Sequence, residues 1–170
     1  KEISAATGAD VRFLLLDLSS LAAVRAFVKA FGQEIKTMKG RPSLLFNNAA
    51  GHGGTNESTA DGWSTKFEID YLGPFLLTEL MLPYLRRPAY SHERSRVVNV
   101  ASDVSEHGCE LAGWRQDCFS DWRYLPIPIT PKENVTVHYN NNVTERGQNT
   151  LYGAVKWLLI QHAAQLARNE

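Results

Sequence analysis

Short apolar runs alternate along the chain with longer stretches of helical periodicity. The runs occupy residues 11–16, 43–46 and 96–100, and each is almost continuous in apolar residues. Such runs are typical of parallel strands covered by helices on both faces. Small polar residues follow each run, and the ligand-binding edge of a parallel sheet lies at the carboxyl ends of its strands. The pattern predicts βαβ units around a parallel sheet.

Helical spacing fills the intervals between these runs. One helix is expected after Ser20, a suitable N-cap residue, with apolar residues on one face up to Phe31. A second pattern runs over residues 62–85, and Pro74 within it should kink or break the helix. A third covers residues 151–167, and residues 1–7 resemble the tail of a helix closed by Gly8.

The periodicity fails between residues 105 and 149. We interpret residues 106–149 as a lid-like excursion or insertion within a single domain over residues 1–170. Trp114, Trp122 and Tyr124 in this segment are suited either to lining a lid over an apolar substrate or to simple packing of a long loop.

The candidate chemistry lies at a strand end and on the last helix. Tyr152 and Lys156 are four residues apart, so they share one helical face, and the ammonium group favours the phenolate form of the tyrosine. Such a tyrosine can serve as the general acid or base for a hydroxyl proton. Ser102 follows the strand at 96–100 and could donate a hydrogen bond to the same substrate oxygen.

Four motifs in this order resemble the short-chain dehydrogenase/reductase family. They are Leu16-Asp17-Leu18-Ser19, Asn47-Asn48-Ala49-Ala50, the strand Val98–Ser102, and the pair Tyr152 and Lys156. The resemblance implies a Rossmann-like, doubly wound parallel sheet in three α/β/α layers. It also implies an NAD(P)-dependent oxidoreductase that interconverts a carbonyl and an alcohol by hydride transfer.

The same resemblance assigns roles to individual residues. Catalysis would involve Ser102, Tyr152, Lys156 and, at the family's fourth catalytic position, Asp70. The cofactor would contact Asp17, Leu18, Asn47, Ala49, Ala50, Tyr152 and Lys156. In this family the aspartate after the third strand contacts the adenine, and the lysine also binds the nicotinamide ribose.

Several features depart from the family pattern. Asp70 stands where the family has an asparagine, so we expect reduced or retuned activity, although a backbone role could survive the change. Ala50 replaces a glycine. The family's first strand and its glycine-rich phosphate turn are absent, and Gly51–Gly54 follows a later strand and is expected to be an active-site loop. We therefore expect a domain truncated at the N-terminus, where the first βαβ unit is missing, and at the C-terminus.

The long excursion resembles those of the retinol dehydrogenase, carbonyl reductase and protochlorophyllide reductase branches. This resemblance implies an apolar carbonyl or alcohol substrate and favours NADP(H) slightly over NAD(H). In this family the long helix at 62–85 and the last helix usually form the dimer face. Because an insertion can cover that face, the sequence is compatible with a monomer or a homodimer.

Composition narrows the classes of partner. The 170 residues carry 18 basic and 18 acidic side chains, which does not suggest a nucleic-acid partner. No apolar run approaches the roughly 18 residues that would span a bilayer. Cys109 and Cys118 match no zinc pattern, so we expect no metal and two free thiols in a cytoplasmic protein.

Two other classes of function compete with the oxidoreductase. Asp70, Ala50 and the missing phosphate turn would suit a catalytically impaired scaffold or binding module that keeps the fold. A serine hydrolase using Ser102 is disfavoured, because Ala101-Ser102-Asp103 lacks the Gly-x-Ser-x-Gly elbow.

Overall fold

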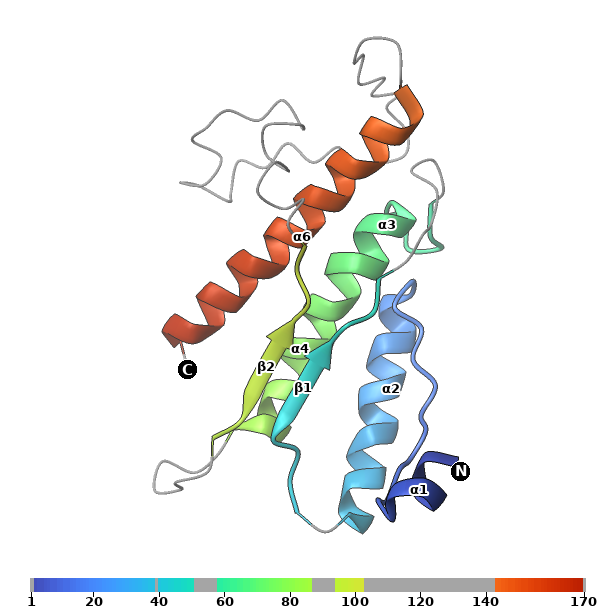
Figure 1. Ribbon diagram of the computed structural model, residues 1–170, viewed down its shortest axis with the longest axis vertical. Helices are drawn as coiled ribbons and strands as arrows, with labels where there is room; N and C mark the ends of the chain where they lie inside the picture. Colours follow the sequence, from blue (N-terminus) through green and yellow to red (C-terminus); the bar gives the residue numbers. More distant parts are fainter. Residues whose placement is uncertain (1, 39, 51–57, 87–93, 103–142, 170) are drawn as a thin grey trace.

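The computed structural model describes residues 2–38, 40–50, 58–86, 94–102 and 143–169 (Figure 1). The elements in these ranges are α1 (Glu2–Thr7), α2 (Leu21–Glu34), the 3-10 turn η1 (Ile35–Thr37), β1 (Leu44–Asn47), α3 (Thr65–Phe67), the π-helical turn η2 (Glu68–Leu72), α4 (Gly73–Leu85), β2 (Arg96–Asn99) and α6 (Val143–Asn169). Strands thus alternate with helices in the α/β order that the sequence predicts.

The strands β1 and β2 lie side by side and are parallel, as expected (Figure 1). Their register pairs Leu44 with Arg96 and Asn47 with Asn99. Alternate residues of a strand point to opposite faces. Leu45 packs into the core formed with α2 and α4, whereas Leu44 and Phe46 on the other face are 54% and 56% exposed. Within the described ranges, helices therefore cover one face of this small sheet.

Helices α2 and α4 form the core beneath β1. The buried members of this cluster are Val24, Val28, Leu77, Met81 and Leu85. Ser20 is the N-cap of α2, and its hydroxyl accepts a hydrogen bond of 3.3 Å from the N–H of Ala23. The expected cap and the expected apolar face of this helix are both confirmed, because local capping and helical spacing need little tertiary help.

The expectation of a strand at residues 11–16 is wrong for this structure. The segment is extended and alternates in exposure, with Phe13 86% and Leu15 81% exposed while Leu14 and Leu16 lie toward α2. A strand also needs a neighbour with which to exchange backbone hydrogen bonds. Among the described residues, β1 and β2 pair only with each other, so the segment lacks a ladder partner. Figure 1 shows it running along α2, apart from the two strands.

The helical pattern over 62–85 is broken, as Pro74 suggested. It divides into α3, η2 and α4, and the N–H of Gly73 reaches back five residues to the carbonyl of Glu68. Proline has no N–H, so Pro74 cannot donate the α-helical bond to the carbonyl of Asp70. A single π turn just before the proline accommodates this loss.

The helix boundaries at the two ends of the chain complete the comparison with the sequence. Helix α1 ends at Thr7, and Gly8 follows with a φ of +69°, as expected for a helix stop. Helix α6 begins at Val143 and therefore takes in the last seven residues of the expected excursion. The remainder of that excursion, including both cysteines, lies outside the described residues, as does Gly51–Gly54.

Candidate active site

Helix α6 brings Tyr152 and Lys156 to one site beside β2. The side chain of Lys156 is 2% exposed, and its Nζ donates a 2.9 Å hydrogen bond to the carbonyl oxygen of Val100. This bond joins the helix to the chain just beyond β2, two residues before the half-buried Ser102. Lys156 and Ser102, predicted from motifs far apart in the sequence, thus lie on directly connected elements.

The aromatic ring of Tyr152 lies against two ammonium groups. The Nζ of Lys156 is 5.5 Å from the ring centroid, and the Nζ of Lys66 on α3 is 4.9 Å from it. A cation over an aromatic face within about 6 Å is attracted by the ring quadrupole. The tyrosine also packs on an apolar cluster that includes Phe67 and Val155. The ring is therefore held between α3 and the body of α6.

Asp70 lies in the π turn, close to this site. Its side chain is fully buried, and its Oδ2 is 3.4 Å from the Nζ of Lys66, one helical turn earlier. Lys66 itself is 6% exposed. The structure thus brings Asp70 into the same charged cluster as Lys66 and Lys156. Its catalytic role stays a prediction.

The electrostatic environment of Lys156 reflects this cluster. Burial lowers the pKa of the lysine from its usual value, because the charged ammonium loses its hydration. The carboxylate of Asp70 acts in the opposite direction and raises that pKa, whereas the positive charge of Lys66 adds to the lowering. The charges of Asp70 and Lys66 therefore act on Lys156 in opposite directions.

Glu68 is a buried acid in the same π turn. It is 0% exposed, and burial followed by the nearby carboxylate of Asp61 raises the pKa of its carboxyl group. Thr59 and the N–H of Leu21 act in the opposite direction, yet neither carboxyl oxygen makes a hydrogen bond of good geometry within the described residues. The Leu21 N–H is already directed to Asp61 at 2.7 Å. Burial therefore dominates at Glu68.

The side chain of Asn47 has a structural role. Its Nδ2 donates to the hydroxyl of Thr78 at 2.9 Å and to Oδ1 of Asn99 at 2.8 Å. Asn99 in turn donates to the carbonyl of Leu159 on α6 at 3.2 Å. This chain of bonds joins β1, β2, α4 and α6, and it uses the N–H groups of the Asn47 amide.

The other predicted cofactor residues lie along the carboxyl ends of the strands and of the 11–16 segment. Oδ1 of Asp17 accepts hydrogen bonds from the N–H and hydroxyl of Ser19, at 2.9 and 2.6 Å, and these bonds lower the pKa of the carboxyl group. The carbonyl of Leu18 lies so near Gly73 that a Cβ there would be 2.6 Å away. Ala49 and Ala50 follow β1 and are exposed.

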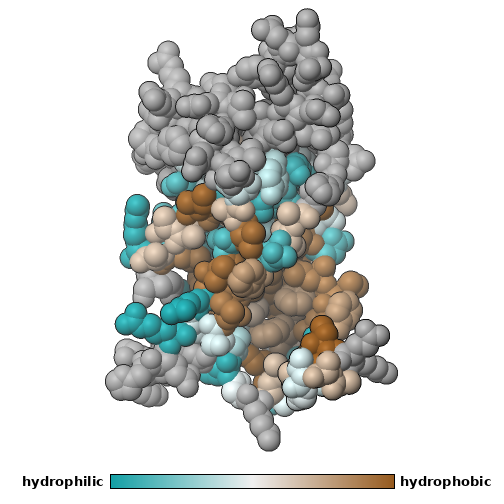
Figure 2. Space-filling view, viewed as in Figure 1, coloured by the Kyte–Doolittle hydropathy of each residue, from teal (hydrophilic) through white to brown (hydrophobic). Residues whose placement is uncertain are grey.

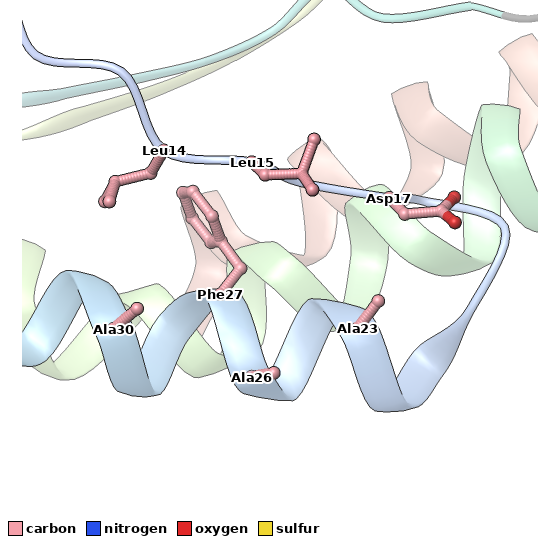
Figure 3. A pocket seen from close by; sticks show the side chains of 7 residues that line it. All are labelled: Leu14, Leu15, Asp17, Ala23, Ala26, Phe27 and Ala30. Atoms are coloured by element: carbon pink, nitrogen blue, oxygen red, sulfur yellow. The ribbon is translucent and has the colours of Figure 1, made fainter.

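A hollow of about 370 Å³ lies between the 11–17 segment and α2 (Figure 3). It is lined by Leu14, Leu15 and Asp17 and, from α2, by Ala23, Ala26, Phe27 and Ala30. None of the residues around Tyr152 lines it. Figure 3 shows Phe27 pointing from the helix toward the extended segment. The hollow is a gap in apolar packing that touches Asp17, and the charged cluster lies elsewhere.

Sequence reasoning missed Lys66 and Glu68. The spacing of Lys66 and Asp70, four residues apart in a helical pattern, was an available signal. That signal is weak, because such pairs are common on exposed helix surfaces. What distinguishes Lys66 and Asp70 from such pairs is their burial. That burial depends on the docking of α6 against α3 and η2.

The described ranges hold no group of three or more His, Cys, Asp or Glu side chains arranged for a metal ion. In the same ranges, no helix combines the length and the apolar character that crossing a bilayer requires.

Comparison with known proteins defines the class. The family model "short chain dehydrogenase" matches residues 1–113, two thirds of the chain. The chain belongs to this family, whose members are NAD(P)-dependent oxidoreductases with a Rossmann fold. Tyr152 and Lys156 lie beyond the matched residues, so their assignment depends on the site itself.

Individual relatives refine this assignment. The chain is 40% identical over 103 residues to human retinol dehydrogenase 11, 38% over 102 residues to zebrafish (Danio rerio) polyprenol dehydrogenase, and 37% over 118 residues to human dehydrogenase/reductase SDR family member 13. These matches cover 60%, 59% and 64% of this chain, and 30%, 30% and 28% of the respective relatives. The matched part is thus less than a third of each relative's length.

Proposed function

We propose that the intact protein interconverts a carbonyl and an alcohol by NAD(P)-dependent hydride transfer, with Tyr152 as the general acid or base. One observation carries the proposal. The buried ammonium of Lys156 lies 5.5 Å from the ring centroid of Tyr152 and donates to the Val100 carbonyl at 2.9 Å, beside the strand end that bears Ser102. The tyrosine and the lysine on α6 thus lie beside the strand end that leads to Ser102, which supports the proposal.

The donors at this site suit a nicotinamide dinucleotide. A lysine ammonium has three N–H donors, and within the described residues one is given to Val100. The others could hold the hydroxyl groups of the nicotinamide ribose. Asp17 uses Oδ1 on Ser19 and keeps Oδ2 as an acceptor for an adenine amino group. The N–H groups of the Asn47 amide already donate within the fold. We therefore assign its cofactor contact to Oδ1 or the backbone N–H, and those of Leu18, Ala49 and Ala50 to the backbone.

The residues of this chain would transfer the hydroxyl proton of the substrate. When bound, the nicotinamide ring supplies or accepts the hydride. Tyr152 donates its phenolic proton to the carbonyl oxygen during reduction and takes a proton from the alcohol during oxidation. The ammonium of Lys156 stabilises the negative charge that develops on the phenol oxygen, and Ser102 holds the substrate oxygen by a hydrogen bond. Asp70 completes the site from the π turn.

The proposal extends to preferences that depend on resemblance. We propose NADP(H) as the preferred cofactor and a long apolar alcohol or aldehyde as substrate, since two of the relatives are named for retinol and polyprenol. We also propose that the complete sheet is doubly wound in three layers. The exposed apolar side chains of Phe13, Leu44 and Phe46 support this by offering a surface for a second helical layer. A cytoplasmic monomer or homodimer stays a prediction from the sequence.

The test uses the purified intact protein with NADPH or NADH and a panel of retinoid, polyprenoid and short-chain aldehydes. We expect cofactor oxidation with the apolar aldehydes and a loss of about 10²-fold or more in kcat for Tyr152→Phe. Tyr71→Phe is the matched control, because Tyr71 is a partly buried tyrosine of the same apolar cluster. Equal turnover by Tyr152→Phe and the parent would overturn the mechanism.

Asp70 favours one alternative, a scaffold that keeps the fold without turnover. Calorimetric titration of the intact protein with NADPH and NADH separates the two functions. Micromolar binding of either cofactor supports the oxidoreductase, whereas the absence of binding supports the scaffold.

A further inference from the structure

Lys66 is a buried lysine that the proposed mechanism does not use. Lysine is almost never fully buried unless it is paired, because removing its charge from water costs several kcal/mol. Here the side chain of Lys66 is 8% exposed, and its partner Asp70 is completely buried. Their Nζ and Oδ2 atoms lie 3.4 Å apart. An ion pair in such a place needs a reason beyond the small stabilisation that an exposed pair at this spacing provides.

The position of the Lys66 ammonium provides that reason. Its Nζ is 4.9 Å from the ring centroid of Tyr152, closer than the Nζ of Lys156, which is 5.5 Å away. The tyrosine ring therefore lies against two ammonium groups that come from different elements. A lysine that served only to pair with Asp70 would not need to face this ring.

Charge balance gives a second reason. Among the residues that the structure describes, the charged side chains that act on Lys156 are Lys66 from α3 and Asp70 from η2. Helix α6 itself contributes Tyr152, and the chain beyond β2 contributes the Val100 carbonyl. Asp70 alone would raise the pKa of Lys156. Lys66 offsets that effect, since it acts on the pKa of Lys156 with the opposite sign.

We propose that Lys66 is a positioning residue of the reaction centre, which neutralises Asp70 and leaves the Lys156 ammonium available to Tyr152 and the cofactor. The role depends on the proposed function for its purpose, but the geometry exists without turnover. In this role Lys66 is also the counter-ion of the Asp70 carboxylate, so Asp70 can take part in the site as a paired group.

The experiment measures the charge state of Lys156 directly. The intact protein is acetylated with trace acetic anhydride over a range of pH, and labelling at Lys156 is quantified by mass spectrometry. We expect Lys66→Met to raise the half-labelling pH of Lys156 by roughly 0.5–1 pH unit, because a positive neighbour is lost. Asp70→Asn should lower it by a similar amount, and Lys66→Arg should keep it near the parent value.

The double variant makes the test decisive even if Lys66→Met alone fails to fold. Adding Lys66→Met to Asp70→Asn removes the second charge in a background where no carboxylate stands at position 70. We expect the half-labelling pH to return upward, close to that of the parent. If Asp70→Asn gives the same half-labelling pH of Lys156 with and without Lys66→Met, Lys66 has only a packing role and the proposal is wrong.

Turnover separates this inference from the proposed function. Where the parent reduces aldehydes, the pH profile of kcat/KM should shift in the same direction as the labelling midpoint in each variant. A protein that shows no turnover but the expected midpoints would overturn the oxidoreductase and keep the Lys66 assignment. Turnover by the parent, with half-labelling midpoints that do not change in the variants, would support the oxidoreductase and overturn the Lys66 assignment.

Discussion

Two regions of this molecule distribute charged and apolar side chains in opposite ways. The charged interior, Lys66, Glu68, Asp70 and Lys156, is at most 6% exposed at any of its members. The apolar edge, Phe13, Leu15, Leu44 and Phe46, is at least 54% exposed. Folded proteins usually show the reverse arrangement. Figure 2 shows hydrophobic residues gathered on the face that looks outward over the strands.

The physical costs of the two regions differ. Each buried charge loses hydration worth several kcal/mol and must regain it from partners, so the charged interior persists only where other packing exceeds that cost. Exposed apolar residues lack the stabilisation of about 25 cal/mol per Å² that burial would give, but their exposure does not strain the fold. The charged interior therefore depends on the docking of α6, whereas substitutions at the apolar edge should have little effect on the free energy of unfolding.

The largest expected effect comes from removing the packing that supports the charged interior. Trp157 on α6 is 3% exposed and belongs to the cluster beneath Tyr152. We expect Trp157→Ala to lower the free energy of unfolding by about 3–5 kcal/mol. The measurement is urea unfolding followed by circular dichroism. Ile160→Ala, at a position 41% exposed on the same helix, should cost less than about 1 kcal/mol.

Similar losses for Trp157→Ala and Ile160→Ala would mean that α6 does not dock as described. The comparison between the two regions would then no longer hold.

A smaller effect is expected where a neutral polar group is buried. Asn47→Ala should lower the free energy of unfolding by about 1–3 kcal/mol, because Thr78 and Asn99 lose a partner. Asn48→Ala, at the exposed neighbouring position, should stay within about 0.5 kcal/mol of the parent. Calorimetric titration of both variants with NADPH tests the alternative role, in which the Asn47 side chain binds the cofactor. Unchanged stability with weaker cofactor binding in Asn47→Ala would contradict the structural role of this side chain.

Glu68 offers a pH-dependent test. The pKa of its carboxyl group is raised in the fold, so its contribution to stability is fully present below the unfolded value of 4.5 and is lost as the pH rises through the folded value. Glu68→Gln removes this loss. We expect the variant to be more stable than the parent by about 1 kcal/mol at pH 8, with the difference shrinking toward pH 4. Thermal unfolding at pH 4, 6 and 8 measures it.

Glu34→Gln is the control for this series. Glu34 is partly exposed and pairs with Arg12 at 3.2 Å. Its replacement should change stability by less than about 0.5 kcal/mol, because an exposed pair is worth little. A gain at Glu34 equal to that at Glu68 would show that net charge, and not burial, is responsible.

The smallest effect is expected at the apolar edge. Leu15→Ala should change the free energy of unfolding by less than about 0.5 kcal/mol, because the side chain is 81% exposed. Leu77→Ala, at a core position 6% exposed, should cost about 2–5 kcal/mol. Urea unfolding of the two variants side by side checks the contrast. A large loss at Leu15 would show that the edge is covered in solution.

Some features followed from local sequence because local physics determines them. Ser20 caps α2, and Gly8 ends α1 with a positive φ, since each needs only nearby backbone groups. Pro74 disturbs the helix because it lacks an N–H, whatever surrounds it. The apolar runs at 43–46 and 96–100 became β1 and β2 because each had the other as a neighbour.

The run at 11–16 has the same apolar character and forms no strand, which shows the limit of such patterns. A ladder needs a partner, and a sequence pattern describes only one side of it. The motifs for Ser102, Tyr152 and Lys156 had an independent source, the resemblance to a family, which the match of residues 1–113 confirmed for the chain as a whole. Their individual roles stay predictions.

The sequence by itself indicated most of the helices, the two strands of the described residues and the family. It also predicted the residues around which a reaction could be arranged. Only the tertiary structure decided that Lys66 faces Tyr152, that Asn47 holds the strands together, and that Glu68 is buried. The first of these outcomes depends on α6 packing against a turn that lies about eighty residues earlier in the chain. Burial arises between distant segments, and no spacing along one segment can specify it, even where the spacing indicates a charge pair such as Lys66 and Asp70.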